Sequence, residues 1–422
     1  MKRKQTIISF VFLIIVLCNL NLGVFFPKNI IAKVSLERNN LKSSEEPLWH
    51  FHTEDSITNV DISSNGKYLV ATEGFDLNRI YLFEKSSSIP VWNYSTSGEL
   101  NCIAISDNAN YIVGGTDDNK VHCLENASNI PIWSYLAESK VNYVAISLNG
   151  SFVAAGSSSN YITQNDLYLF NTTNIVDPHL WDRNPSAILE AIDMSGHGEY
   201  LVAGFSDYYV YVYNNIGNEL WNFQTGHYVN DVAISSDGNY IIAGTSWDDH
   251  NVYLFNTTDT SNPLLWQYNA GEEIYSLAIS NNGSYIAAGT EWGKILLFNP
   301  LVSSPLWTYN AKGDIYSLDF SANGKYLVVG DTEGYLLLFE ASKSKPIGSF
   351  KVTGSVRSVA ISSDGDYIVA GCLHEGLYLF SRENFPPAQD SEDAVISFGN
   401  YFLLIMSIAM ISLVVITKIK RK

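Results

Sequence analysis

The stretch Ser358–Gly371 reads SVAISSDGDYIVAG, and seven close variants of it precede it in the chain. Those variants begin near Asn59, Asn101, Asn142, Leu189, Asn230, Tyr275 and Tyr316. A repeat of roughly 40 to 50 residues is typical of one supersecondary unit that is stacked many times, because a single unit cannot bury its apolar faces alone. The repetition therefore predicts an assembly of eight similar units.

Each copy of the repeat has the pattern of four short strands. Apolar and polar residues alternate, and an Asn-Gly or Asp-Gly pair such as Asn282–Gly283 interrupts the alternation, which is a strong hairpin signal. A third run rich in branched and aromatic residues follows, as at Ile295–Phe298, and a fourth carries a tryptophan such as Trp307. We name these predicted strands A, B, C and D.

Four strands per repeat of about 40 residues are typical of a propeller blade. The sequence therefore predicts an all-β fold, an eight-bladed β-propeller of four-stranded blades over residues 48–380. A spare D strand, Leu48–Phe51, precedes the first copy, and the last copy stops after its C strand at Phe380. We expect the N-terminal strand to complete the last blade and close the ring, which would leave no exposed seam.

The two ends of the chain predict attachment to a membrane. Residues 1–32 combine a basic start with an apolar run and predict a signal peptide or an uncleaved N-terminal anchor, followed by a linker at 33–47. Residues 381–393 form a Pro-containing acidic linker. Residues 394–417 carry no charge and are long enough for a transmembrane helix, and the basic tail 418–422 is predicted to be cytoplasmic. We therefore expect the propeller outside the cell, at the cell membrane.

Charge and cysteine content narrow the range of partners. The formal net charge is −18 at pH 7, and it would be more negative without the basic ends, so we expect no nucleic acid ligand. Cys102 and Cys123 fall on strands A and C of one blade, about 9.6 Å apart for two strand spacings, which exceeds the roughly 7 Å that a disulfide spans. We expect no disulfide.

In ordinary propeller order, A–B turns and C–D loops share one rim, which we call the proximal rim because both chain ends leave from it. D–A and B–C loops share the opposite, distal rim. Six Asn-x-Ser/Thr sequons are candidate N-glycosylation sites, and all but the first map to the proximal rim: Asn93, Asn126, Asn149, Asn171, Asn256 and Asn282. Turn chemistry alone can also produce such sequons, and the sequence leaves both interpretations open.

The distal rim carries the candidate binding residues, because long loops on a rigid scaffold are where binding usually resides. These are Phe75, Asp76, Asp117, Asp118, Tyr161, Asp207, Tyr208, Trp247, Asp248, Asp249, Glu291, Trp292 and Glu333. Trp247 and Trp292 differ from the other tryptophans, which all occupy the repeated D position. Exposed tryptophan beside carboxylates suits sugar stacking or a cationic partner, while packing beneath a loop is the alternative.

Strand A carries an aspartate in three blades where the other five have alanine, at Asp61, Asp193 and Asp319. One interpretation is a set of axial carboxylates that bind a cation or a polar ligand. The other is a structural role, in which each carboxylate accepts hydrogen bonds from backbone or hydroxyl groups between blades. We favour the structural role.

No motif of a known catalytic site is present. The chain has neither a nucleophile elbow, nor a phosphate-binding glycine loop, nor a His-Glu-x-x-His zinc motif, and its Asp-rich turns lack calcium-loop spacing. We therefore do not expect an enzyme, a bound metal or a cofactor.

The Val-Tyr-Leu-Phe run, the Leu-Trp that follows it and the Ser-Asp-Gly-x-Tyr phrase resemble eight-bladed quinoprotein-like and WD-repeat-like propellers, which include bacterial and archaeal surface proteins. The resemblance covers Leu48–Phe380 and implies the fold more strongly than an activity. We expect a membrane-anchored binding or scaffolding module for a protein or glycan partner. The alternatives are a quinone-dependent dehydrogenase on the same ring and a purely structural envelope protein.

Overall fold

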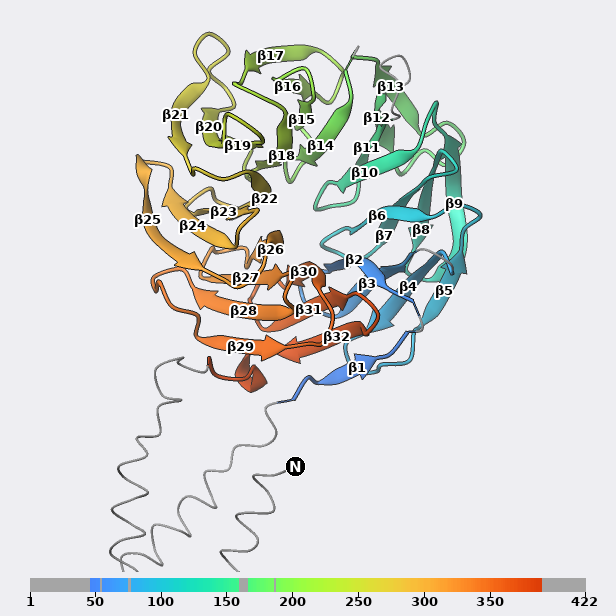
Figure 1. The fold of residues 1–422 in the computed structure, drawn as a ribbon. Helices are drawn as coiled ribbons and strands as arrows, with labels where there is room; N and C mark the ends of the chain where they lie inside the picture. The colour runs from blue at the N-terminus through green and yellow to red at the C-terminus, as the bar shows by residue number, and fades with distance from the viewer. Residues whose placement is uncertain (1–45, 54, 75–76, 159–165, 186, 389–422) are drawn as a thin grey trace, which may run out of the picture. The chain divides into compact units, whose positions relative to one another are not determined.

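The computed structural model describes residues 46–388, except for residues 54, 75–76, 159–165 and 186. All eight repeat copies form four-stranded antiparallel sheets that are arranged around a common centre (Figure 1). Strand A is innermost and strand D outermost in each sheet, as the strand order requires. The predicted all-β, eight-bladed propeller is confirmed.

The strands run in chain order through the blades, and within each blade they follow in the order A to D. Blades 1 to 4 comprise β2 (Ile57–Ile62), β3 (Tyr68–Glu73), β4 (Arg79–Glu84) and β5 (Trp92–Ser95); β6 (Leu100–Ile105), β7 (Tyr111–Thr116), β8 (Lys120–Glu125) and β9 (Ser128–Leu136); β10 (Val141–Ile146), β11 (Phe152–Ser157), β12 (Asp166–Asn171) and β13 (His179–Arg183); β14 (Leu189–Met194), β15 (Tyr200–Phe205), β16 (Tyr209–Asn214) and β17 (Glu219–Gln224).

Blades 5 to 8 comprise β18 (Val229–Ile234), β19 (Tyr240–Thr245), β20 (Asn251–Asn256) and β21 (Leu264–Asn269); β22 (Ile274–Ile279), β23 (Ile286–Thr290), β24 (Lys294–Asn299) and β25 (Val302–Asn310); β26 (Ile315–Phe320), β27 (Tyr326–Asp331), β28 (Tyr335–Glu340) and β29 (Gly348–Lys351); β30 (Val356–Ile361), β31 (Tyr367–Cys372), β32 (Gly376–Ser381) and β1 (Trp49–Phe51). A 3-10 turn, Arg382–Asn384, follows the last blade.

The A–B turns explain why the repeated phrase contains Ser, Asp and Gly. In blade 8 the Ser362 hydroxyl donates to Asp364 Oδ1 at 2.6 Å and accepts from the Tyr367 backbone N–H at 3.0 Å. Gly365 has a φ of +76°, which favours glycine, and a Cβ there would lie 2.6 Å from the Tyr326 ring of the preceding blade. The phrase thus specifies both the turn and its close contact with a neighbour.

The ring closes as the sequence predicts. Strand β1 pairs with β32 in antiparallel register, with Trp49 opposite Leu379 and Phe51 opposite Leu377. The Leu48 backbone N–H adds a bond of 2.7 Å to the Leu379 carbonyl. The first strand of the described chain therefore completes the blade that the last strands begin (Figure 1).

A tryptophan of strand D fastens most blades to the next. Its ring packs on an aromatic residue of the next C strand, as Trp307 does on Phe339 with ring centroids 5.3 Å apart. Its indole N–H donates to a backbone carbonyl in the next C–D loop, as from Trp307 to Ala341 at 2.8 Å. The same bond forms from Trp49, Trp92, Trp181, Trp221 and Trp266.

Blade 7 lacks this tryptophan, and a segment from beyond the last blade takes its place. Gly348 stands at the tryptophan position, opposite Leu338. The Phe385 ring is buried and packs 5.1 Å from Phe380 of blade 8, and a Cβ on Gly348 would lie 2.5 Å from its Cδ1. The Ser349 N–H donates to the Pro386 carbonyl at 2.9 Å and holds the segment on strand D. The C-terminal segment therefore replaces the missing side chain.

The sequence also predicts that no disulfide forms and that the chain ends attach to a membrane. Cys102, Cys123 and Cys372 have free thiols. Within residues 46–388, apart from the gaps named above, there is no helix with the length and apolar character needed to cross a membrane. The predicted N-terminal segment, transmembrane helix and basic tail lie outside the described residues.

We predict that Phe385→Ala in the full-length chain lowers the free energy of unfolding by about 3 kcal/mol, because emptying a buried phenylalanine site typically costs about that much. Urea unfolding followed by tryptophan fluorescence measures the change. Phe385→Leu should lose less, and Ile216→Ala, at an apolar residue that is 71% exposed, should lose nothing measurable. Equal midpoints for Phe385→Ala and the unaltered chain would contradict the assignment.

Candidate functional site

The distal rim, formed by the D–A and B–C loops, is the face on which the sequence placed the candidate binding residues. Phe75, Asp76 and Tyr161 lie outside the described residues. The others all lie on B–C loops and fall into two groups. Several carboxylates accept hydrogen bonds from their own loop or its flanking strands, whereas other side chains are exposed.

The two carboxylates of the blade 2 loop are used to hold that loop. Asp117 Oδ1 accepts from the Glu99 backbone N–H at 2.8 Å, which ties the B–C loop to the preceding D–A loop. Asp118 accepts from the Thr116 hydroxyl and forms an ion pair of 2.5 Å with Lys120. Partial burial would raise the pKa of Asp118, but these contacts together outweigh it and lower the pKa to about 2. Both side chains therefore have a structural role.

A second pair of candidate carboxylates is bound by tyrosines of strand C. Asp249 accepts from the Tyr253 hydroxyl at 2.8 Å, and Asp207 accepts from the Tyr211 hydroxyl at 3.3 Å. The same pairing of a carboxylate with a strand C tyrosine recurs in or beside the B–C loop at Glu73 with Tyr81, Asp166 with Tyr168, and Glu375 with Tyr378. The repetition indicates a device that shapes B–C loops.

Trp247 and Trp292 are the exposed candidates. Trp247 is 61% exposed and Trp292 is 74% exposed, although each is a large apolar side chain on a loop tip. Trp247 has a φ of +52° and lies 6.1 Å from the His227 ring, which itself packs on Tyr208 and Tyr228. Neither tryptophan is packed beneath its loop, so the alternative of a core role does not fit them.

A ring of residues at the distal end of strand A was not recognised from the sequence. In every blade the pairing of strands A and B shifts at the second residue of strand A, which marks a β-bulge. We call these residues the bulge ring: Thr58, Asn101, Asn142, Glu190, Asn230, Tyr275, Tyr316 and Arg357. They lie at or just before the start of the repeated phrase, and their variability was the available signal.

Three pairs of neighbours in the bulge ring contact one another at the distal end of the A strands. The Asn101 amide donates to Asn142 Oδ1 at 3.2 Å, across blades 2 and 3. Tyr275 and Tyr316 stack in parallel with centroids 5.1 Å apart and an interplanar angle of 4°. The Arg357 guanidinium lies over the Tyr316 ring at 5.3 Å. Blades 6 to 8 therefore present a continuous stack of planar groups.

The strand A aspartates bridge adjacent blades. Asp61 accepts from its neighbour Ile62 N–H through Oδ1, at 2.7 Å, and from Ile105 N–H of blade 2 through Oδ2, at 2.8 Å. Asp193 and Asp319 make the same pair of bonds to Met194 with Ile234 and to Phe320 with Ile361. This geometry is the structural arrangement that the sequence favoured.

Asp231 makes an equivalent bridge that the sequence did not single out, from Val232 N–H at 2.9 Å to Leu277 N–H of blade 6 at 2.7 Å. Burial raises the pKa of Asp61, Asp231 and Asp319 to about 7 and that of Asp193 to about 6. The two backbone donors at each carboxylate lower these pKa values, so the burial effect prevails over them.

The candidate sequons lie in turns and at strand ends. Asn149 and Asn282 are in A–B turns and use their side-chain oxygens to accept from Ser151 and Ser284 backbone N–H groups. Asn171 and Asn256 end C strands, Asn126 follows one, and Asn93 lies on β5. Glycosylation of these residues stays a prediction.

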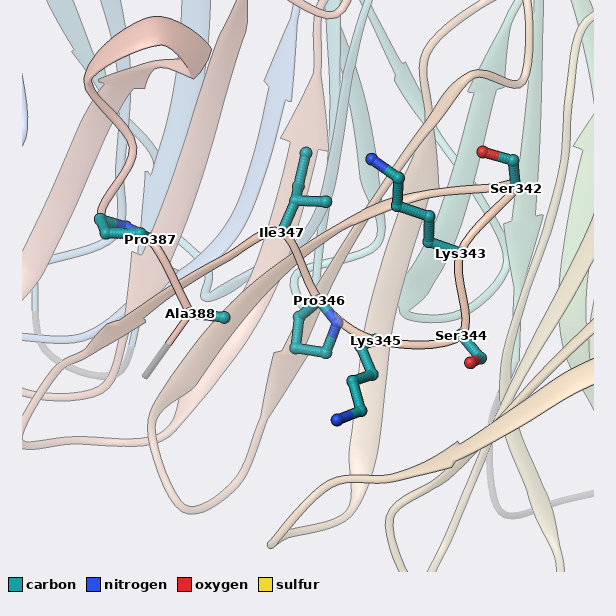
Figure 2. A pocket seen from close by; sticks show the side chains of 8 residues that line it. All are labelled: Ser342, Lys343, Ser344, Lys345, Pro346, Ile347, Pro387 and Ala388. Carbon is teal, nitrogen blue, oxygen red and sulfur yellow. The ribbon is translucent and has the colours of Figure 1, made fainter. Parts of the chain in front are cut away.

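A shallow, open pocket of about 520 Å³ lies away from the distal rim, between the C–D loop of blade 7 and the C-terminal segment. Its lining residues are Ser342, Lys343, Ser344, Lys345, Pro346, Ile347, Pro387 and Ala388. Figure 2 shows Lys343 and Lys345 projecting from the loop in different directions. Across the parts of the chain that the structure describes, no three His, Cys, Asp or Glu residues gather where they would hold a metal ion.

Five segments of the chain match the family described as "WD domain, G-beta repeat": residues 88–123, 217–256, 264–299, 303–340 and 344–380. Each segment begins before or within a D strand and extends through strands A, B and C of the next blade. The chain therefore carries WD40 repeats on an eight-bladed propeller. A comparison with curated proteins finds no match.

Solved structures of similar fold include Sqt1 from Chaetomium thermophilum, with a TM-score of 0.69 and 15% identity over 80% of this chain and 98% of Sqt1. The same protein bound to the N-terminus of ribosomal protein L10 gives a TM-score of 0.68 at 15% identity, over 80% and 100% of the two chains. The Dos1 propeller gives 0.66 at 14% identity, over 80% and 94%. At this identity the likeness establishes the fold alone.

We predict that the aspartate bridges make the ring less stable as pH rises from about 4 to about 7. Their folded-state pKa values exceed the usual value of about 3.9, so the folded ring binds more protons than the unfolded chain in this window. Stability from these groups is present at low pH and is lost as pH passes the folded pKa. The loss of unfolding free energy between pH 5 and pH 8, measured with urea, should therefore be smaller for Asp231→Asn than for the unaltered chain.

The control for this measurement is Asp248→Asn, at an exposed carboxylate of the distal rim. It should leave the difference in unfolding free energy between pH 5 and pH 8 unchanged. An identical pH dependence for Asp231→Asn and Asp248→Asn would contradict the prediction, whatever the absolute stability of each variant.

Proposed function

We propose that this protein is a binding module that captures a protein partner on its distal rim. The observation that carries the proposal is the exposure of Trp247 and Trp292, at 61% and 74%, on loops of a rigid ring. Tryptophan is enriched among the residues that dominate binding energy at protein interfaces. Two such side chains, held away from the core, are better suited to contact with a partner than to the stability of the ring.

A protein partner is favoured over a glycan by the variety of side chains around these tryptophans. The rim combines indoles, the tyrosines of the bulge ring and carboxylates, which together fit the mixed surface of a polypeptide. Among proteins of similar fold, Sqt1 has been solved with the N-terminus of ribosomal protein L10 bound. A glycan, for which tryptophan stacking alone would serve, is the other outcome of the test.

We further propose that residues 394–417 hold the ring at the outer surface of a cell membrane, with residues 418–422 inside. The uncharged length of this segment and the basic residues that follow it support the proposal. So does the path of the chain, since the D strand β1 begins and the C strand β32 ends on the proximal rim, which would leave the distal rim free to meet a partner.

We infer binding rather than catalysis. The rim carboxylates that would serve as acids, bases or ligands, such as Asp118 and Asp249, are occupied in holding their loops. A quinone-dependent dehydrogenase would reduce a dye when supplied with pyrroloquinoline quinone and calcium, and dye reduction by the purified chain would overturn this inference. A purely structural envelope protein would show no partner that depends on the rim.

We predict that Trp247→Ala combined with Trp292→Ala reduces partner capture at least tenfold, because loss of a dominant interface residue typically costs about 2 kcal/mol or more. Cross-linking on intact cells, with the captured proteins and glycans quantified by mass spectrometry, measures the change. The control is Val176→Ala with Ile216→Ala, two exposed apolar residues of the proximal rim. Equal capture by the tryptophan variant and the control variant would move the site elsewhere.

We predict that truncation after Ala388 releases the ring into the medium, because it removes the proposed membrane span. Fractionation of cells that express the full-length and truncated chains measures the distribution between membrane and medium. A truncated chain that stays in the membrane fraction would show that residues 1–32 act as an uncleaved anchor, which would contradict a single C-terminal span.

A further inference from the structure

We propose that the bulge ring binds an arginine side chain of the partner, with its guanidinium on the outer face of Tyr275. The proposal rests on the proposed function, because the bulge ring opens on the distal rim. It adds the chemistry of the recognised group and the place where that group lies.

Blades 6 to 8 hold a stack of planar groups that ends at Tyr275. Tyr275 and Tyr316 are parallel, 5.1 Å apart, and the Arg357 guanidinium lies over the Tyr316 ring at 5.3 Å. One end of the stack therefore already holds a guanidinium from the protein itself. The other end is Tyr275, whose ring contact among the described residues is with Tyr316. Toward blade 5 the bulge ring continues with Asn230, a smaller side chain whose amide donates to the Ile274 carbonyl at 3.1 Å.

Four carboxylates lie on the D–A and B–C loops next to the tyrosine pair. The Glu291 N–H donates to the Glu273 carbonyl at 3.0 Å, and the Thr332 N–H, beside Glu333, donates to the Asp314 carbonyl at 3.1 Å. Burial and the nearby carboxylates of Glu291 and Glu273 raise the pKa of the Tyr275 hydroxyl to about 12. Burial and the charges of Glu291 and Glu333 likewise raise the pKa of Asp314.

Nearby cations do not neutralise these carboxylates. The ion pairs formed within the described residues include none of Glu273, Glu291, Asp314 or Glu333. Lys294 is paired with Glu272 at 3.0 Å, and the Lys312 ammonium lies 4.7 Å from the Tyr335 ring centroid. An approaching cation would therefore gain contacts that the chain does not supply.

The planar face of Tyr275 favours arginine over lysine. A guanidinium stacks flat on an aromatic ring and donates in its own plane to carboxylates beside the ring, whereas an ammonium is a point charge with stronger hydration. A phosphate or another anion would be repelled by the same carboxylates. Trp292, exposed beside Glu291, offers an apolar surface for the aliphatic part of the arginine side chain.

The test uses fluorescently labelled peptides of alternating glycine and arginine, and matched peptides with lysine or citrulline in place of arginine, titrated into the purified full-length chain. Citrulline keeps the size and planar shape of arginine without its charge. We expect the arginine peptide to bind most tightly, followed by lysine and then citrulline, as measured by fluorescence anisotropy. Equal affinity for the arginine and citrulline peptides would overturn the proposal.

The variants separate stacking from charge. Tyr275→Ala should weaken binding of the arginine peptide on the order of tenfold, because a desolvated cation–π contact is lost. Tyr275→Phe keeps the ring face and should keep most of the affinity. Glu291→Gln with Asp314→Asn and Glu333→Gln should weaken binding and reduce its salt dependence. The matched control is Glu125→Gln with Asp177→Asn and Glu199→Gln, exposed carboxylates of the proximal rim, which should change neither.

Two outcomes would contradict the inference, and both are distinguishable from failure of the proposed function. If Tyr275→Ala folds and binds the arginine peptide with the affinity of the unaltered chain, the bulge ring is not the site. The same conclusion follows if the two triple variants bind with equal affinity and equal salt dependence. Partner capture that still depends on Trp247 and Trp292 would then leave the proposed function standing. If Tyr275→Ala does not fold, Tyr275→Phe and the triple variants still decide the question.

Discussion

Every blade of this ring has two apolar faces, and each face is buried only by packing against a neighbouring blade. This single requirement explains why the chain must return to its starting point. Strand β1 closes the last sheet beside β32, and Phe385 fills the gap between blades 7 and 8 where Gly348 replaces the usual tryptophan. An unclosed ring would expose an apolar face and an unpaired strand edge together, which favours aggregation.

The sequence predicts the fold well because the packing requirement is repeated eight times. Nearly every copy provides the same kind of turn, the same apolar faces and the same tryptophan contact, so the pattern is visible without any structural knowledge. Closure was also predictable, since a D strand is left over at the start of the repeat array and the last copy lacks one. The exception in blade 7 was not, because Phe385 lies after the last repeat and contacts Gly348 only through the folded ring.

The candidate site was only partly predictable, for a related reason. The distal-rim loops could be located from strand order, but the sequence did not reveal that Asp118, Asp207 and Asp249 are bound by side chains of the loop or its flanking strands. Those bonds depend on distances across a loop. The bulge ring was missed because its members share a position and not a residue type, so no repeated residue marks that position.

Within this chain, some positions repeat one residue in most blades, while the bulge positions share only their place in strand A. This difference also supports the proposed function. Positions that keep the same residue in seven of the eight blades, such as the turn glycine and the D strand tryptophan, are fixed by packing at the turn and between blades; blade 2 has Ala109 and blade 7 has Gly348 at these positions. The bulge residues are free of that constraint, since Thr, Asn, Glu, Tyr and Arg all occur there while the strand geometry stays the same. A position that tolerates all of them without altering the fold can be adapted to a ligand, and this freedom supports the proposed role of Tyr275, Tyr316 and Arg357 in recognition.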